Sequence, residues 1–220
     1  MPDTGFALAS IWAIYKDGVF GIPSTDSVFN PYHDEVLGLD VRGAASIRRE
    51  NLFQYLSWFT DSPPILVVGE APGPWGCRFT GVPYTSERLF SEGIFPFRGR
   101  RTSAKVEPCA ERTATIFWRV MIAHLPRFVI WNTLPLHPHR AGEPLTIRPP
   151  TAGEMREYLP MMEAVMTAIR PETVLAVGRI AQNALRKLDR RFIPIRHPSH
   201  GGAAEFQKGM DSVLNFDTHR

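Results

Sequence analysis

The chain has 220 residues, of which 44% are hydrophobic and 21% are charged, a balance typical of a soluble globular protein. This length suits one large domain, and the lack of an apolar run of about 18 residues, or of a basic leader at residues 1–5, argues against a membrane span and a secretory signal. A net charge of +3 permits a nucleic-acid partner without requiring one, and two cysteines, Cys77 and Cys109, are too few for a disulfide framework or a four-thiolate cluster.

The first 60 residues are the least informative part of the sequence. After an apolar run at 11–15, residues up to about 40 are rich in glycine, proline, aspartate and asparagine, and we expect 1–45 to form an irregular cover over the core. Between residues 48 and 59, apolar side chains recur at helical spacing, which predicts a helix. We therefore expect a single domain over 1–220, with an N-terminal cover and helix at 1–60 and a core at 65–210.

The stretch 65–84 is the centre of the chain. Four apolar residues at 65–68 follow two prolines and predict a short strand buried on both faces. Glu70 then opens a loop rich in glycine and proline. Ligands of α/β proteins bind beyond the carboxyl ends of parallel strands, so a charged residue at this point indicates a functional loop. For the loop alone, an ordinary tight turn is the alternative interpretation.

Strands and helices alternate downstream. Helices are predicted over four segments: 113–125, 151–169, where Thr151 and Glu154 match a capping box, 180–188 and 205–215. Further strands are predicted over 128–131, 173–177 and 192–195, with long loops at 95–108 and 133–150. Four strands separated by helices predict an α/β fold, a three-layer α/β/α sandwich around a four-stranded parallel sheet.

A candidate functional residue stands at the end of each predicted strand: Glu70, Asn132, Gly178 and His197. Because the carboxyl ends of parallel strands meet at one edge of the sheet, these residues should converge on one crevice. Each has an alternative structural explanation, since an Asn at a strand end usually caps a turn and a His before Pro is usually structural. Their joint occurrence, one on each strand, favours an active site.

An ordered set of motifs resembles the uracil-DNA glycosylase superfamily: Gly69-Glu70-Ala71-Pro72-Gly73, Thr80-Gly81-Val82-Pro83-Tyr84, the strand that ends at Asn132, Arg148-Pro149-Pro150-Thr151 with Glu154, and His197-Pro198-Ser199. The first and fourth motifs are similar to the iron–sulfur bacterial and archaeal branch. Residues 72–76 together with 80–83 are instead similar to the single-strand-selective monofunctional branch. The resemblance spans about 65–210 and makes this segment a catalytic core with a uracil-DNA glycosylase-like fold. It implies a monofunctional DNA glycosylase that flips uracil, or another deaminated or 5-substituted base, out of DNA and hydrolyses its N-glycosidic bond in base excision repair.

The resemblance also implies roles for the matched residues. Tyr84 stands where relatives stack an aromatic ring, usually Phe, on the flipped base. Asn132 would pair with uracil O4 and N3–H, a pattern that cytosine reverses. His197 would donate a hydrogen bond to O2 as negative charge develops there. Glu70 would orient the attacking water, although most branches place an Asp or Asn one residue later, where this chain has Ala71. The motifs contain no lysine, which predicts hydrolysis without strand cleavage.

The base pocket departs from that of the familiar relatives. A tyrosine that blocks the methyl group of thymine follows the motif proline in those enzymes, and Gly73 stands there in this chain. We expect Ala71 and Gly73 to form part of a roomier pocket that accepts 5-substituted uracils or deaminated purines such as hypoxanthine. Trp75 is an alternative gate for the same pocket.

Contacts with DNA are expected from the loops at the strand ends: Pro72, Gly178, Ser199, His200 and Gly201. Of these, Ser199 and the amides around His200 and Gly201 would hold phosphate near the extruded nucleotide. Gly178 lies at a predicted helix N-terminus, a natural anion site. Arg98, Arg100 and Arg101 are further candidates for backbone contacts.

We expect no metal and no cofactor, because the iron–sulfur branch needs four cysteines, and the two cysteines with His137 and His139 do not match a common zinc spacing. The expected partner is DNA that contains uracil or another deaminated base, and the product is an abasic site. We further expect a monomer without membrane contact, in the bacterial cytoplasm and associated with the nucleoid. Three alternatives stay open: a damaged- or abasic-DNA binding module of the same fold with little turnover, a nucleotide hydrolase or cofactor-binding α/β protein, and a protein-interaction domain. The second lacks a Walker loop or a dinucleotide fingerprint.

Overall fold

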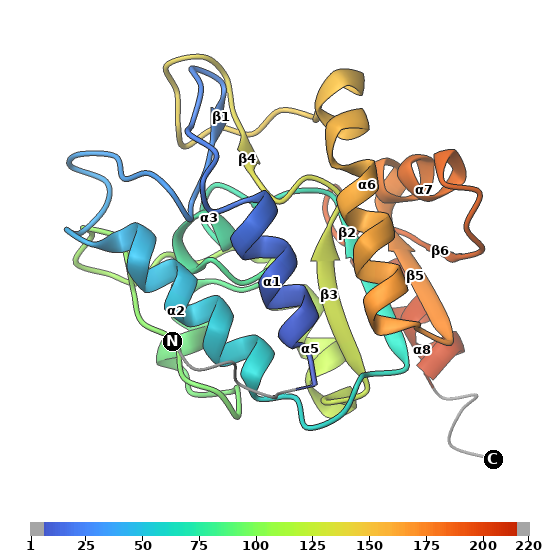
Figure 1. Cartoon of the computed structure of the whole chain (residues 1–220). Helices are drawn as coiled ribbons and strands as arrows, with labels where there is room; N and C mark the ends of the chain where they lie inside the picture. Colours follow the sequence, from blue (N-terminus) through green and yellow to red (C-terminus); the bar gives the residue numbers. More distant parts are fainter. Residues whose placement is uncertain (1–6, 215–220) are drawn as a thin grey trace.

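The computed structural model describes residues 7–214 (Figure 1). The expectation that residues 1–5 contain no leader, and the last residue of the predicted terminal helix, Asn215, lie outside these described residues. No helix among the described residues is long and apolar enough to cross a membrane.

A four-stranded parallel sheet lies at the centre, in the order β3-β2-β5-β6. Its strands are β2 (Ile65–Gly69), β3 (Phe128–Asn132), β5 (Thr173–Val177) and β6 (Ile193–Ile195). All four were predicted from apolar runs, and β2 and β3 are buried along their whole length. Pro194 is tolerated because β6 is an edge strand, where one side of the backbone needs no ladder partner.

Helices cover both faces of the sheet, which confirms the predicted α/β/α sandwich. The longer helices are α1 (Ala9–Gly18), α2 (Ala44–Ser57), α5 (Arg112–Met121), α6 (Ala152–Ile169), α7 (Gly178–Lys187) and α8 (Ala203–Leu214). Figure 1 shows α1 and α6 in front of the sheet and α5 and α8 behind it. The predicted capping box of α6 is present, since the Thr151 hydroxyl accepts from the Glu154 amide and the Glu154 carboxylate accepts from the Thr151 amide.

Short elements fill the connections. These are the helices α3 (Cys77–Thr80) and α4 (Glu87–Ser91), the 3-10 turn η1 (Ile122–His124), and a two-stranded antiparallel ribbon of β1 (Val28–Phe29) and β4 (His137–Pro138). The predicted loop 133–150 therefore contains a strand, and the predicted irregular cover 1–45 contains both β1 and the ten-residue helix α1. Helix α1 forms because Ile11 and Tyr15, one helical turn apart, are buried against the core.

The N-terminal cover braces the loop that follows β2. Asp40 accepts hydrogen bonds from two buried arginines, Arg48 of α2 and Arg78 of α3. The guanidinium of Arg48 is buried and therefore unavailable to a ligand. The Tyr32 hydroxyl donates to the Gly81 carbonyl at 2.7 Å, and the Asn51 amide donates to the Thr80 carbonyl at 2.8 Å. These bonds fix residues 78–81 from outside the core.

Candidate active site

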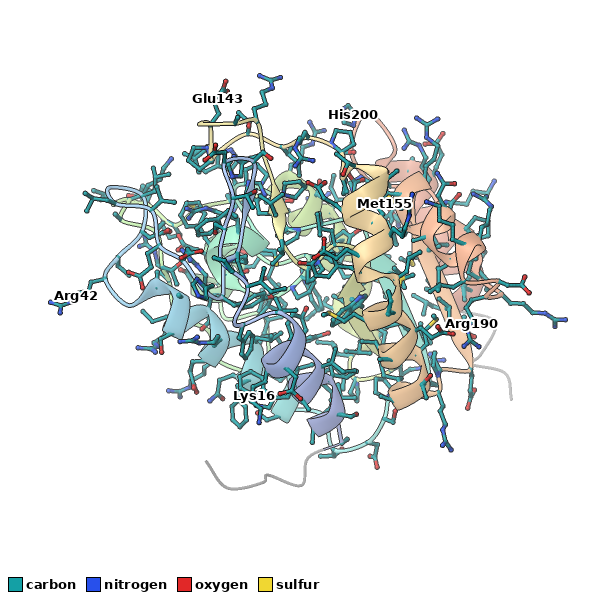
Figure 2. The ribbon with its side chains drawn as sticks, turned by 45° about the horizontal axis from the view of Figure 1, so that its top comes forward. Lys16, Arg42, Glu143, Met155, Arg190 and His200 are labelled. Carbon is teal, nitrogen blue, oxygen red and sulfur yellow. The ribbon has the colours of Figure 1, made fainter. Side chains whose placement is uncertain are left out.

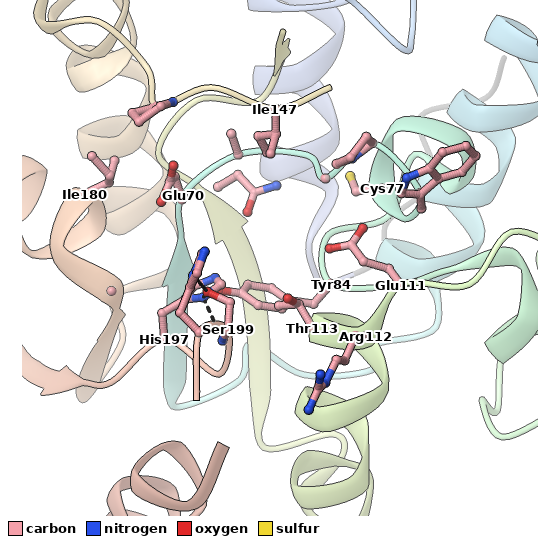
Figure 3. Close-up of a pocket in the computed structure, with 18 of the residues that line it drawn as sticks. Glu70, Cys77, Tyr84, Glu111, Arg112, Thr113, Ile147, Ile180, His197 and Ser199 are labelled. Atoms are coloured by element: carbon pink, nitrogen blue, oxygen red, sulfur yellow. Dashed lines mark hydrogen bonds between the residues drawn. The ribbon is translucent and has the colours of Figure 1, made fainter. Parts of the chain in front are cut away.

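A cavity of about 700 Å³ opens at the carboxyl ends of the strands (Figure 3). Residues from six segments form its wall: the segment that follows β2, the start of α5, the end of β3, the loop before α6, the start of α7, and the turn that follows β6. The eleven residues predicted for the site include nine that line this cavity: Glu70, Ala71, Gly73, Tyr84, Asn132, Gly178, Ser199, His200 and His197.

The other two predicted residues lie beside the wall. Pro72 is buried, and its carbonyl oxygen accepts a hydrogen bond at 2.7 Å from Nδ1 of His137, which anchors the loop to the β1–β4 ribbon. Gly201 has a φ of +79°, a left-handed conformation that suits glycine, in the turn after β6.

The register of β2 and β3 places Glu70 and Asn132 together. Gly69 pairs with Asn132, and two hydrogen bonds continue the pairing: the Thr133 amide donates to the Gly69 carbonyl at 2.9 Å, and the Leu134 amide donates to the Glu70 carbonyl at 3.0 Å. A Cβ at Gly69 would lie 2.8 Å from Asn132 Oδ1 and 2.5 Å from the Tyr84 ring. Glycine is therefore required where these two side chains cross the strand end.

Tyr84 forms an aromatic floor for the cavity. One side of its ring stacks on Phe117 of α5, with centroids 4.4 Å apart and an interplanar angle of 23°. Its backbone has a φ of +54°, an uncommon conformation for a residue with a side chain, and Trp118 Nε1 supports it by donating to the Tyr84 carbonyl at 2.8 Å. Phe117 covers one face of the ring, so a planar ligand in the cavity could stack only on the opposite face.

The hydrogen bonds of His197 define its tautomer. Nδ1 accepts the backbone N–H of Ser199 at 3.2 Å and lies 2.7 Å from the Ser199 hydroxyl. Since an amide N–H can only donate, Nδ1 carries no proton in the neutral ring, and the proton is on Nε2. Burial lowers the pKa of His197 to about 4, so the imidazole is a neutral Nε2–H donor at physiological pH.

Gly178, the first residue of α7, lies against this histidine. It has a φ of +84°, and a Cβ there would lie 3.2 Å from Cβ of His197. The close approach of β5 and β6 at this point needs a glycine. In the turn after β6, the Ser199 amide donates to Nδ1 of His197 and the Gly202 amide donates to the Ser199 carbonyl at 3.0 Å. In Figure 2 His200 lies at the upper edge of the molecule.

Two carboxyl groups line the same cavity. Burial raises the pKa of Glu70, which stands at the end of β2. Burial also raises the pKa of Glu111 to about 7, and Oε2 of this residue is sealed from solvent without a hydrogen-bond partner among the described residues. Carboxyls with perturbed pKa values in one cleft are typical of sites that perform acid–base chemistry.

Sequence reasoning missed Glu111 and Arg112. Glu111 caps α5 in a polar stretch that follows a loop, so no strand end marks it. Four arginines line the cavity: Arg112, Arg148, Arg179 and Arg196. Arg148 is held by an ion pair with Glu154 at 2.6 Å, whereas the other three are exposed. Three arginines proposed from the sequence, Arg98, Arg100 and Arg101, do not line the cavity, and Arg101 donates to the carbonyls of Lys105 and Val106.

Both cysteines are free and buried, and Cys77 lines the cavity. Burial raises the pKa of both thiols, which keeps them protonated. Within residues 7–214, no three His, Cys, Asp or Glu side chains are grouped in a way that could hold a metal ion.

The model of the uracil DNA glycosylase superfamily matches residues 56–216 of this chain. Among solved structures, the chain is similar to wild-type SMUG2 of Pedobacter heparinus, with a TM-score of 0.61 and 17% sequence identity over 95% of this chain and 96% of that chain. At this level of identity, the structural likeness shows the shared fold alone. No curated protein sequence matches the chain.

Proposed function

Because this chain belongs to the uracil DNA glycosylase superfamily, we propose that it is a monofunctional DNA glycosylase that hydrolyses the N-glycosidic bond of uracil in DNA. The observation that supports this proposal most strongly is the meeting of Glu70, Asn132, Tyr84 and His197 at one cavity, from three separate parts of the chain. The cavity volume of about 700 Å³ exceeds what a pyrimidine needs, which supports our proposal that other deaminated or 5-substituted bases also enter.

The proposed reaction begins with extrusion of the nucleotide into the cavity. The flipped base stacks on the free face of Tyr84, an interaction that contributes about 1–3 kcal/mol. The carboxamide of Asn132 then pairs with O4 and N3–H of uracil. Because Asn132 is buried at the sheet edge, cytosine would leave its amide unpaired, and this unpaired group disfavours the wrong base.

Bond cleavage moves negative charge onto the base and positive charge onto the sugar. His197 donates a hydrogen bond from Nε2 to O2 of the departing uracil anion. Glu70 accepts a proton from the attacking water and stabilises the cationic sugar. The elevated pKa of Glu70 makes it a better proton acceptor than an exposed carboxylate while leaving it ionised above that pKa.

A base-release assay tests the proposal. A labelled duplex with one uracil is incubated with the wild type, Asn132→Ala or His197→Ala, and alkali then cleaves the abasic site. We expect cleavage at the uracil that falls by at least about a hundredfold in each variant, since each removes a charge-stabilising or base-reading group. A folded wild type that releases neither uracil nor hypoxanthine, from single- or double-stranded DNA, would instead favour a damage-binding module.

We also propose that the protein is a monomer. Sedimentation of the same preparation tests this by measuring its molecular mass in solution.

A further inference from the structure

Glu111 lines the cavity but has no part in the mechanism proposed above. Its carboxyl group occupies the space beside Gly73 and Gly76, where an added Cβ would overlap it at either position. Oε2 is sealed from solvent and has no hydrogen-bond partner among the described residues. Although Glu111 stands at the N-cap of α5, its side chain makes no capping bond. A buried polar atom without a partner calls for an explanation, and a catalytic role at the cavity is one.

The position of Glu111 relative to His197 indicates which part of a base it meets. Figure 3 shows these two side chains on opposite sides of the Tyr84 ring. A uracil stacked on Tyr84 with O2 at His197 therefore directs the opposite corner of its ring, C5, toward Glu111. Uracil has only a C–H bond there. A purine in the same orientation presents its five-membered ring, whose N7 is a hydrogen-bond acceptor.

We propose that Glu111 is a second catalytic carboxyl group of this site, which donates a proton to N7 of a flipped deaminated purine. The proposal rests on the glycosylase function proposed above. Gly73 and Gly76 take part in it because their missing side chains make room for the acid. The Glu111 carboxyl fills the space that the two glycines leave, so they place an acid in the pocket and do not widen it there.

The proton balance explains why a purine needs this group. As the C1′–N9 bond breaks, its electrons move into the purine, and the Glu111 proton adds to N7 to give a neutral base. Water forms the new O–C1′ bond and passes a proton to Glu70. The reaction ends with Glu111 ionised and Glu70 protonated, and exchange with solvent restores both. His197 cannot replace Glu111, because its Nδ1 is already an acceptor and its Nε2–H is a hydrogen-bond donor of a neutral ring.

The protonation state of Glu111 fits this role. Its pKa of about 7 leaves much of it protonated at neutral pH. Two other titratable groups, Cys77 of α3 and Tyr84, lie close enough for their pKa values to respond to its charge. Burial keeps both groups neutral, so neither compensates a Glu111 carboxylate. Arg112 follows Glu111 in the chain, but it is exposed.

Single-turnover excision of hypoxanthine and of uracil, each in the same duplex, tests the proposal across about pH 6 to about pH 9. In the wild type, we expect hypoxanthine excision to fall relative to uracil excision at the same pH as the pH rises through about 7. Glu111→Gln keeps the shape and a hydrogen-bond donor but has no proton to transfer. It should lower hypoxanthine excision by about a hundredfold or more, remove the pH inflection, and change uracil excision by less than about threefold.

Controls separate the possible failures. Glu107→Gln changes an exposed carboxyl four residues away and should leave both rates unchanged. Uracil excision by Glu111→Gln reports that the variant is folded, and Glu111→Asp, which retains an acid, should recover part of the hypoxanthine activity. Equal loss of both activities in Glu111→Gln, an unchanged pH profile, or a wild type that excises uracil but no purine would overturn the role of Glu111 and leave the uracil proposal standing. A wild type that excises no base would overturn both.

Discussion

Two features of Tyr84 are unfavourable for the stability of the fold. Its backbone adopts a left-handed φ, and its hydroxyl is buried without a hydrogen-bond partner among the described residues. A buried hydroxyl without a partner costs about 1–3 kcal/mol relative to one in water. Stability alone does not explain a tyrosine here, whereas its ring has a clear position between Phe117 and the cavity. The ring is therefore the part that we expect to matter.

Tyr84→Phe tests this separation of ring from hydroxyl. The variant keeps the stacking surface and removes the unpaired hydroxyl, so we expect the unfolding free energy to stay equal or to rise by up to about 1 kcal/mol. Uracil excision should stay within about threefold of the wild type. Tyr84→Ala removes the ring and should lower excision by roughly ten- to a hundredfold. Urea denaturation and single-turnover excision measure the two effects, and a Tyr84→Phe variant as impaired as Tyr84→Ala would show that the hydroxyl contributes.

Of the two carboxyl residues of the cavity, Glu70 can be predicted from the sequence as a site residue, and Glu111 cannot. Glu70 directly follows an apolar run, so its place at a strand end is readable from local pattern. Glu111 comes after the long loop 95–108, and only the path of that loop brings it to Gly73 and Gly76. Those two glycines were visible as a turn, but the side chain that fills the space between them was not. A contact of this kind between distant segments leaves no periodic pattern in the sequence from which it could be predicted.

Secondary-structure elements were predicted correctly where a local sequence pattern marks them. Apolar runs bounded by turn residues gave all four strands of the sheet, and the capping box placed the start of α6 at Thr151. Helix α1 was missed because its ten residues include an apolar run and then Lys16-Asp17-Gly18, so its buried face shows only through Ile11 and Tyr15. The β1–β4 ribbon was missed because two residues per strand are too few to show alternation.

The loop 95–108 depends on a buried carboxylate of α4. Glu87 accepts hydrogen bonds from the amides of Thr102 and Ser103 at 2.7 Å each, from the Ser103 hydroxyl at 2.5 Å, and from the Cys109 amide at 2.9 Å. Burial alone would raise the pKa of Glu87, but these bonds outweigh it and hold the pKa below its usual value. The same loop leads to Glu111, so its order also fixes the cavity wall.

Glu87→Gln should therefore destabilise the fold. The new amide NH₂ faces backbone donors, which leaves at least one buried N–H unpaired, and we expect a loss of about 1–3 kcal/mol at pH 7. A carboxyl whose folded pKa is depressed stabilises above its unfolded pKa, and this contribution disappears as pH falls through the folded pKa. Between about pH 5 and about pH 3, the wild type should thus lose more stability than the variant.

Urea denaturation over this pH range measures the effect of Glu87→Gln. Glu92→Gln is the matched control, because Glu92 is exposed and forms an ion pair with Arg88 at 3.4 Å on the helix surface. We expect that control to stay within about 0.5 kcal/mol of the wild type. Equal stability of Glu87→Gln and the wild type at pH 7 would contradict the role of the buried carboxylate.

At the scale of the whole molecule, the net charge of +3 understates how positive charge is arranged around the cavity. Arg112 of α5, Arg179 of α7 and Arg196 after β6 are exposed and line the same opening. The elements that carry them meet only in the folded chain. Arg98, Arg100 and Arg101 were predicted from the sequence as backbone contacts, but they do not line the cavity, and Arg101 donates to loop carbonyls. The positive charge around the cavity is therefore a rim assembled by the fold.

Substitution of all three rim arginines, Arg112, Arg179 and Arg196, by Ala tests whether this rim binds phosphates. Each phosphate that the variant no longer neutralises should reduce the slope of log binding constant against log salt concentration by about 0.9 for duplex DNA, so three arginines account for up to about 3. The loss of affinity should be the same for undamaged DNA and for DNA with one uracil, since phosphates carry no sequence information.

The control replaces Arg186, Lys187 and Arg191, which have the same total charge but do not line the cavity. Fluorescence anisotropy from about 50 to about 200 mM salt distinguishes the two sets. If both triple variants lower the slope equally, net charge alone attracts DNA, and if only the rim variant does, the backbone is bound around the opening through which a flipped base must pass.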